Sequence, residues 1–355
     1  MKILRQQIAQ MLIMGFSGAA IDEQSPISKW LGGDGLGGVL LFDYDLIKKS
    51  PGKNLQTKAQ IKQLTTQLKR YGQHSAFARE EGLDPFIAID YEGGAVDRLA
   101  SIEGCLKTKK PCELAMLSDE ALRVEAGKMA KMLQDLGFTL NFAPVVDLNL
   151  NEEQGIIGKL GRSFSADSKQ VARVAKIFVE VFAGYGLSCC YKHFPGHGSA
   201  IGDTHQGFVN VTETFQSKEL EPYSLLLTHT ELPAMIMTAH VINHKLDASG
   251  LPATLSYSIL TGLLRQELGF NGVIISDDLQ MQAIANHYSV EDVLRLTINA
   301  GADMLIFANQ LGEITAPELI DKIEKMVQEN LIAKERIEEA YQRILGLKQR
   351  QLAFV

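Results

Sequence analysis

Two features are missing from this sequence: long runs of lysine or arginine, and any long apolar segment. Without basic runs, and with a net charge of −7, the chain lacks the basic face that binds nucleic acid or an anionic membrane. No window reaches the roughly 18 apolar residues that span a bilayer. We therefore expect that the protein binds neither nucleic acid nor a membrane. We expect a monomer that binds a small or neutral ligand.

A signal peptide is also missing, because residues 1–8 have the pattern of a charged amphipathic helix. We expect a cytoplasmic protein, or a periplasmic or secreted one if a leader has been removed.

Cysteine is scarce. Cys105 and Cys112 flank a short loop that a disulfide could close in an oxidising compartment. Cys189 and Cys190 are adjacent on a predicted strand, and we expect both to be core residues.

The sequence does contain a repeated alternation of short apolar runs and helical periodicity, which is typical of βα units. Helix signals are clear: Ser118, either Asp167 or Ser168, and Ser289 each stand before an apolar stripe with helical spacing. Eight apolar runs are predicted strands, at residues 11–16, 38–42, 86–89, 140–145, 187–191, 234–238, 272–275 and 304–307.

Eight such units without a linker predict an α/β fold, one (β/α)8 TIM-type barrel over residues 1–355. The charged helical stretch 317–350 adds C-terminal helices that we expect to close the barrel from outside. The alternative is a doubly wound open sheet. A dinucleotide-binding sheet would need a G-x-G-x-x-G turn after the first strand, and none follows residues 11–16.

Polar residues stand where the predicted strands end, and in a barrel the active site lies at the carboxyl ends of the strands. Asp90, Asp147 and His240 each follow a strand, as do the pairs Lys192-His193 and Asp277-Asp278. An aspartate in this place is often only the N-cap of the next helix, and we interpret Asp278 in that way. Two glycines after Glu92 delay any helix behind Asp90, so that carboxylate is expected to face the barrel mouth.

Residues 190–205 concentrate three histidines, a lysine and an aspartate in a segment rich in glycine and proline, which indicates a catalytic loop on a strand end. His193 and His197 have the H-x-x-x-H spacing of a metal site. Two histidines with that spacing can bind one metal ion when they lie on the same face of a helix. Pro195 makes a helix here very unfavourable. We expect no metal, and we interpret His197 as a hydrogen-bond donor that orders the loop.

Several segments resemble the glycoside hydrolase family 3 enzymes, in particular the single-domain β-N-acetylglucosaminidases, including those of bacterial cell-wall recycling. The resemblance covers most of the chain. The most specific segments are residues 192–205 (Lys-His-Phe-Pro-Gly-His-Gly with Asp-Thr-His) and 263–278; residues 89–94, 141–147 and 161–164 support them.

The resemblance implies that Asp277 is the nucleophile, that His205 is the general acid/base, and that Asp203 is the partner of that histidine. It implies that the sugar is held by five residues, Asp90, Arg98, Arg162, Lys192 and His193, and that no metal or cofactor takes part. Retaining glycosidases need a nucleophilic carboxylate and a proton donor about 5 Å apart. An imidazole that titrates near neutrality can fill the second role.

Two departures from the family pattern stand out. Thr204 replaces a serine and keeps the hydroxyl group, whereas Ala95 replaces an arginine and could alter contacts with the leaving group. We therefore expect a retaining exo-β-N-acetylhexosaminidase that removes terminal β-linked N-acetylglucosamine from oligosaccharides or peptidoglycan fragments. A β-glucosidase-like or phosphorolytic glycosidase of the same fold, a metal-dependent hydrolase and a non-catalytic sugar-binding protein remain alternatives.

Overall fold

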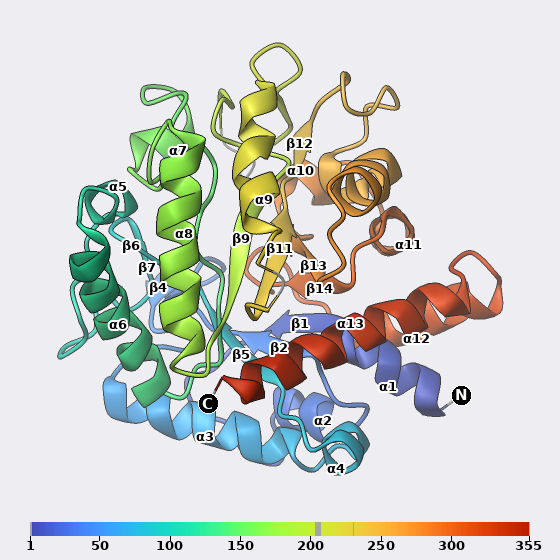
Figure 1. Cartoon of the computed structure of the whole chain (residues 1–355). Coiled ribbons are helices and arrows are strands. Elements are labelled where there is room, and N and C mark those ends of the chain that lie inside the picture. The colour runs from blue at the N-terminus through green and yellow to red at the C-terminus, as the bar shows by residue number, and fades with distance from the viewer. Residues whose placement is uncertain (1, 203–206, 230, 355) are drawn as a thin grey trace.

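The computed structural model describes residues 2–202, 207–229 and 231–354 (Figure 1). Eight parallel strands close into a barrel in the order β1-β14-β13-β11-β9-β8-β5-β2, which confirms the predicted fold class. Each of the eight predicted apolar runs overlaps one barrel strand. The barrel strands are β1 (Leu12–Gly15), β2 (Gly38–Leu40), β5 (Phe86–Ile89), β8 (Leu140–Asn141), β9 (Ser188–Phe194), β11 (Ala234–Thr238), β13 (Ile274–Asp278) and β14 (Met304–Phe307).

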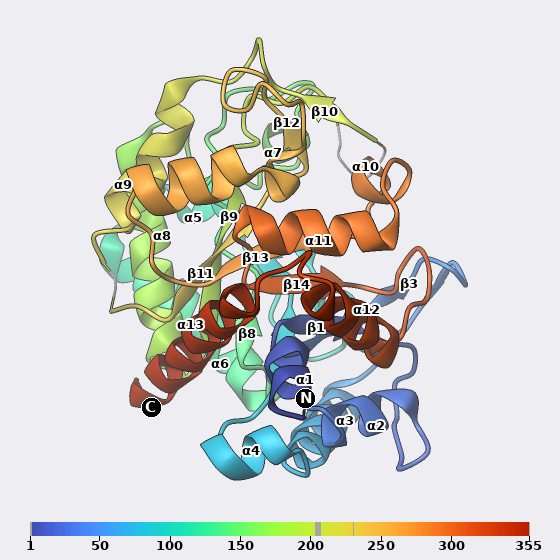
Figure 2. The same cartoon turned by 90° about the vertical axis from the view of Figure 1, so that its right-hand side faces the viewer.

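Helices and short strand pairs surround the barrel (Figures 1 and 2). The helices are α1 (Lys2–Gln10), α2 (Pro26–Gly32), α3 (Lys58–Gly72), α4 (Ala76–Glu81), α5 (Pro111–Leu114), α6 (Asp119–Asp135), α7 (Ile156–Lys159), α8 (Ser168–Ala183), η1 (Ser217–Leu220), α9 (Glu221–Leu226), η2 (Ala253–Leu255), η3 (Ser258–Glu267), α10 (Gln282–Ala285), α11 (Val290–Ala300), α12 (Ala316–Gln328) and α13 (Lys334–Ala353). The short strands pair as β3 (Tyr44–Asp45) with β4 (Ser50–Pro51), β6 (Tyr91–Gly93) with β7 (Val96–Asp97), and β10 (Val209–Asn210) with β12 (Val241–Ile242). None of the helices described is long and apolar enough to span a membrane.

Local sequence signals account for where the main outer helices begin. The Ser118 side chain accepts a hydrogen bond from the N–H of Ala121 at the start of α6, and Asp167 caps α8 in the same manner. Ser289 does so at the start of α11. A side-chain oxygen at this position satisfies an N–H group that has no partner inside the helix. The three predicted helix starts are confirmed, and of the two candidates for α8 the cap is Asp167 and not Ser168.

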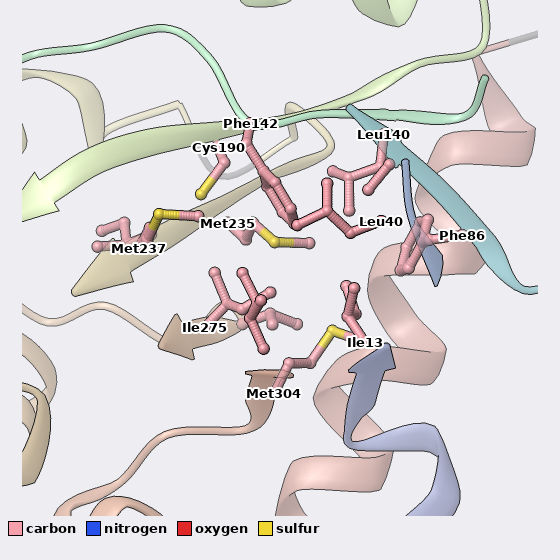
Figure 3. Packing of buried hydrophobic residues seen from close by; sticks show 14 of the residues in the cluster. Ile13, Leu40, Phe86, Leu140, Phe142, Cys190, Met235, Met237, Ile275 and Met304 are labelled. Atoms are coloured by element: carbon pink, nitrogen blue, oxygen red, sulfur yellow. The ribbon is translucent and has the colours of Figure 1, made fainter. Parts of the chain in front are cut away.

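The interior of the barrel is filled by side chains and is not a channel. Figure 3 shows residues from facing strands that meet in the middle, among them Phe86, Phe142, Met235 and Met304. Cys190 points into this core, and it and Cys189 are fully buried, as predicted. Cys105 and Cys112 are free thiols, so the possible disulfide is not formed. Because the core is packed, a ligand can reach the strands only at their ends.

Five of the eight strands end at other residues than the sequence pattern predicts, and two of them, β1 and β2, end only one and two residues early. Strand β9 continues to Phe194 and β13 to Asp278, so polar residues expected just beyond these strands belong to them. Strand β8 ends early, at Asn141. Pro144 has no N–H group to donate to a neighbouring strand, and pairing resumes only as a single bridge between Val145 and Lys192.

The last helix closes the amino-terminal end of the barrel, as predicted for the C-terminal stretch. Lys348 on α13 is 2% exposed, and its Nζ donates to Gln10 Oε1 (2.9 Å) and to the carbonyl oxygen of Asp84 (3.0 Å). Gln351 Nε2 donates to the carbonyl oxygens of Thr139 and Gly186. These acceptors precede β1, β5, β8 and β9, so one helix ties four strand starts together.

The buried Lys348 should make folding stability depend on pH. Burial lowers the pKa of Lys348 from 10.5 to about 7. Between these values the unfolded chain binds more protons than the folded chain, so the free energy of unfolding rises with pH. We expect this group to add on the order of 1 kcal/mol per pH unit between about pH 7 and pH 10, and Lys348→Met to remove that slope.

Urea unfolding of both proteins at several pH values measures the slopes. Lys325→Met is the control, because the Lys325 side chain is 73% exposed and its loss should leave the slope unchanged. Equal slopes in wild type and Lys348→Met would show that Lys348 has the same pKa in the folded and unfolded states.

Candidate active site

A cavity of about 320 Å³ opens at the carboxyl ends of the barrel strands. It is lined by six of the eight residues for which the family resemblance implies a catalytic or sugar-binding role: Asp90, Arg98, Arg162, Lys192, His193 and Asp277. The other two, Asp203 and His205, lie outside the described residues. The six come from four separate parts of the chain, and the closed barrel brings them together.

A buried ionic network forms one wall of the cavity, with Glu92 at its centre. Lys192 Nζ lies 2.7 Å from Glu92 Oε1 and 3.2 Å from Asp90 Oδ1. Arg162 binds Glu92 through two parallel hydrogen bonds, each 2.8 Å long. Such a bidentate pair fixes the plane of the guanidinium as well as its position. The network therefore holds four charged side chains in one orientation before any ligand arrives.

The charges in this network keep one another ionised. Burial alone would raise the pKa of Glu92, but the positive charges of Arg162 and Lys192 outweigh it and hold that pKa well below its usual range. Burial alone would lower the pKa of Lys192, but the carboxylates of Glu92 and Asp90 outweigh it and raise that pKa. At neutral pH the wall presents an ammonium, a guanidinium and carboxylates at fixed places, which suits a ligand rich in hydroxyl groups.

Asp147, which follows β8, orients His193. Its Oδ2 lies 2.7 Å from His193 Nδ1 and also accepts the backbone N–H of His193, while its Oδ1 accepts the N–H of His197. Burial would raise the pKa of Asp147, but His193 outweighs burial and the pKa is lowered. An ionised carboxylate can only accept, so we assign the proton of His193 to Nδ1.

A second buried carboxylate, Glu219 on η1, holds the start of the loop that follows β9. It accepts the N–H groups of Gly198 and Ser199 and the hydroxyl of Ser199, the last at 2.6 Å. Gly196 has a φ of +145°, and a Cβ there would lie 2.8 Å from the Cβ of Glu219. Only glycine fits so close an approach. The segment that leads toward residues 203–205 is therefore anchored by packing and by a carboxylate.

Asp277 and Asp278 end β13 with different surroundings. Asp277 Oδ1 accepts the N–H of Asp278 at 2.8 Å, which orients its carboxylate at the cavity. Asp278 Oδ1 accepts the N–H groups of Gln280 and Ala308. The prediction that Asp278 caps the next helix is wrong, because Asp278 lies in the strand and Met281 is the residue before α10.

His240 supports this strand from behind. It is 1% exposed, and its Nε2 donates to the carbonyl oxygen of Asp278 at 2.9 Å. It is not among the residues that line the cavity. His240, which follows β11, therefore helps to hold β13 in position and does not line the ligand cavity.

The mouth of the cavity has an apolar side. Tyr44, Leu46 and Leu311 line it while keeping 39%, 47% and 48% of their surface exposed. Gln310 joins the two loops that carry them, because its Nε2 donates to the carbonyl oxygen of Tyr44 and its Oε1 accepts from Lys53 Nζ. The site thus combines a charged wall with a partly apolar entrance.

Within the part of the chain that the structure describes, no group of three or more histidine, cysteine, aspartate or glutamate side chains is placed to hold a metal ion. The rings of His193 and His197 lie with their centres 6.0 Å apart. His193 already uses Nδ1 for Asp147. Asp203 and His205, which stand close to these two histidines in the sequence, lie outside the described residues.

Sequence reasoning missed the residues that support the site, namely Glu92 and Glu219, and it noted Asp147 without a role. Glu92 and its partner Arg162 are 70 positions apart, and Asp147 and His193 are 46 apart. No spacing rule links residues so distant in the chain. The sequence contains a weak signal for Glu92 alone. This carboxylate stands two positions after Asp90, directly before two glycines, and so lies at the same strand end.

Comparison with known proteins agrees with this arrangement. The family model described as "Glycosyl hydrolase family 3 N terminal domain" matches residues 3–347. Beta-hexosaminidase A of Pseudoalteromonas piscicida is 32% identical over 334 residues, which cover 88% of this chain and 53% of that protein. This chain therefore spans about half the length of that relative. A beta-hexosaminidase of Xylella fastidiosa (strain M23) is 31% identical and is matched over 85% of its length and 88% of this chain.

Solved structures show the same likeness. A glycoside hydrolase family 3 beta-N-acetylglucosaminidase from Paenibacillus sp. superposes with a TM-score of 0.84 at 30% identity, covering 99% of this chain and 63% of that one. A glycosyl hydrolase of the same family from Mycobacterium smegmatis gives 0.79 at 27% identity, with 97% and 96% covered.

Proposed function

Because this chain belongs to glycosyl hydrolase family 3, we propose that it is a retaining exo-β-N-acetylhexosaminidase. The substrate would be an oligosaccharide or peptidoglycan fragment that ends in β-linked N-acetylglucosamine. The relatives named beta-hexosaminidase support the choice of sugar.

One observation carries the proposal: a cavity that has a carboxylate on one side and a wall of fixed charges on the other. In the barrel order β13 and β5 are four strands apart, so Asp277 and Asp90 lie on opposite sides of the ring. Lys192 and His193 on β9 lie between them. A sugar ring held by the charged wall would thus face the carboxylate of Asp277. The packed barrel core closes the bottom of the cavity, so a sugar chain can enter it by one end but cannot pass through it, and this supports exo cleavage.

The reaction would run in two displacements. A carboxylate oxygen of Asp277 attacks the anomeric carbon, the bond to the leaving oxygen breaks, and His205 gives that oxygen its proton. Water then attacks the glycosyl-enzyme, His205 takes a proton from the water, and Asp277 leaves as a carboxylate. Two inversions at one carbon produce net retention. Asp203 would hold the imidazole in the required tautomer.

In this mechanism the charged wall binds the sugar and does not react with it. Hydrogen bonds between charged groups and neutral hydroxyls are stronger than bonds between neutral groups. Lys192 and Arg162 can donate to sugar oxygens. Asp90 can accept from hydroxyl groups, and so can His193 Nε2, because the proton of His193 is on Nδ1. Because Glu92 and Asp147 already orient these side chains, little ordering remains to be done when the sugar binds.

The test is a set of aryl β-glycosides that differ only at the 2-substituent, acetamido against hydroxyl, assayed with and without inorganic phosphate. We expect kcat/KM to be at least about tenfold higher for the acetamido substrate, since a site built to bind a polar group discriminates against its absence. Free N-acetylglucosamine should be the product under both conditions. Equal rates on both sugars would indicate a β-glucosidase, and a sugar 1-phosphate would indicate phosphorolysis.

A further inference from the structure

The rim of the cavity has two halves of different chemistry. The charged wall stands on β5 and β9 and on the segment that follows β8, three neighbouring strands of the ring. The opposite arc, β13-β14-β1-β2, brings to the cavity Met281, Gln310, Leu311, Tyr44 and Leu46, which we call the apolar half. A terminal sugar held by the charged wall would turn its anomeric carbon toward β13. The leaving group would then extend away from the wall, over the apolar half.

His197 also lines the cavity, but it offers a sugar no polar atom. Both of its ring nitrogens are buried and have no hydrogen-bond partner among the described residues. The interpretation of His197 as a hydrogen-bond donor that orders the loop through its ring is therefore wrong. Its backbone N–H, and not its ring, donates to Asp147.

The apolar half is held in place. Tyr44, Leu46 and Leu311 are exposed, but Gln310 between them is 6% exposed and ties their loops together. Its Nε2 donates to the carbonyl oxygen of Tyr44 at 3.0 Å, and its Oε1 accepts the N–H of Leu46 at 3.3 Å. Large apolar side chains that are grouped and exposed at a cavity mark a ligand-binding surface. The fixed loops mean that this surface exists before any ligand arrives.

The cations at the cavity are already paired. Among the described residues that line it, the lysines and arginines are Arg98, Arg162 and Lys192. The last two bind Glu92 in the charged wall. The guanidinium nitrogens of Arg98 lie 3.5 Å from a carboxylate oxygen of Asp43 and 3.7 Å from one of Asp90. No lining cation is left to neutralise a negative charge on the leaving group.

The apolar half also has acidic neighbours. Asp277 and Asp278 line the cavity beside it. The one lysine behind its loops, Lys53, is 4% exposed and does not line the cavity. Its Nζ donates to the carbonyl oxygen of Asn309 and to Gln310 Oε1, so its charge serves the loop. A leaving group with a carboxylate would therefore meet carboxyl groups and carbon.

We propose that the leaving group is a neutral N-acetylhexosamine whose ring packs on Tyr44, Leu46 and Leu311, and that a leaving sugar with a carboxylate is disfavoured. The inference rests on the proposed function, since it takes Asp277 as the nucleophile. The faces of a pyranose ring consist of C–H groups and its hydroxyls lie at the edge, so the ring can cover apolar side chains while the hydroxyls stay in water. Of the two substrate classes proposed above, this selects the neutral oligosaccharide over the peptidoglycan fragment.

The experiment compares three disaccharides in which N-acetylglucosamine is β-1,4-linked to N-acetylglucosamine, to N-acetylmuramic acid or to the methyl ester of that acid. The ester keeps the bulk of the acid but not its charge. We expect kcat/KM to be at least about tenfold lower for the acid than for the neutral disaccharide. The ester should recover most of that loss, and added salt should raise kcat/KM for the acid alone.

Tyr44→Ala and Leu311→Ala test the apolar half directly. We expect each to lower kcat/KM on the neutral disaccharide by about 5- to 20-fold. On N-acetyl-β-glucosaminyl fluoride both should stay within about twofold of wild type, because the small fluoride leaving group does not contact either side chain. Tyr257→Ala is the matched control, since Tyr257 is 59% exposed but does not line the cavity. It should change the rate on none of these substrates.

Cleavage of the acid as fast as the neutral disaccharide, or an ester cleaved as slowly as the acid, would overturn the inference. Equal losses on the disaccharide and the fluoride in the Tyr44 and Leu311 variants, or no loss on either, would do the same. Cleavage of the fluoride but of none of the disaccharides would overturn the inference and leave the proposed glycosidase in place. Absence of wild-type turnover on the fluoride and on all three disaccharides would refute the proposed function, and this inference with it.

Discussion

Asp277→Asn should abolish turnover of every glycoside substrate, lowering kcat by about 10⁴-fold or more. An amide is the same size as a carboxylate but cannot form the glycosyl-enzyme. The amide oxygen can still accept the N–H of Asp278, so the fold around the site should be kept. Steady-state kinetics on an activated aryl glycoside measure the loss, and thermal unfolding checks the fold.

Asp278→Asn is the matched control at the neighbouring position. Its side chain accepts the N–H groups of Gln280 and Ala308, and an asparagine oxygen can do the same. We expect a loss of no more than about tenfold, because this change removes a structural acceptor and not the attacking group. A larger loss at Asp278 than at Asp277 would reverse the assignment.

A covalent trap distinguishes a nucleophile from a residue that only binds. A 5-fluoro glycosyl fluoride that keeps the 2-acetamido group should label wild type on the peptide that contains Asp277. With Asp277→Gly, azide should restore cleavage of an activated substrate and give the α-glycosyl azide, since one inversion replaces two. Label on Asp278, or a β-azide product, would rule out the proposed role.

His205→Ala should separate two kinds of substrate. A nitrophenolate is a weak base and can leave without a proton, whereas a sugar alkoxide is a strong base and cannot. We expect cleavage of a disaccharide to slow by ~10²–10⁴-fold, while formation of the glycosyl-enzyme from a nitrophenyl glycoside slows much less. The intermediate should then accumulate, because the same imidazole is missing when water must be activated. Pre-steady-state kinetics would show this as a burst of nitrophenol.

Asp203→Asn should show the same pattern in a milder form, because the imidazole remains but loses its orienting partner. His229→Ala is a control for loss of a histidine that does not line the cavity. If His205→Ala instead raises KM equally for both substrates with kcat intact, His205 only binds the sugar. The proton donor would then have to be another residue.

The barrel itself follows from local patterns in the sequence. Each of the eight apolar runs overlaps a strand, and a helix starts at each of the three predicted places, with Ser118, Asp167 and Ser289 as the caps. These features depend on residues a few positions apart, whose hydrogen bonds and periodicity can be read directly from the chain. The placement of candidate residues at strand ends follows in turn, because parallel strands in a barrel all end at one rim.

The closed tertiary structure decides which side chains meet at that rim. Strands β9 and β13 run on through His193 and Asp278 because neighbouring strands offer them hydrogen-bond partners, which no local pattern encodes. Glu92 becomes the centre of an ionic network, and Asp147 the partner of His193, because the barrel brings distant strand ends within hydrogen-bonding distance. The sequence by itself determined the barrel and the rim where chemistry can occur. Packing alone decided the charge state and orientation of the residues there, since burial and neighbouring charges are properties of the folded chain.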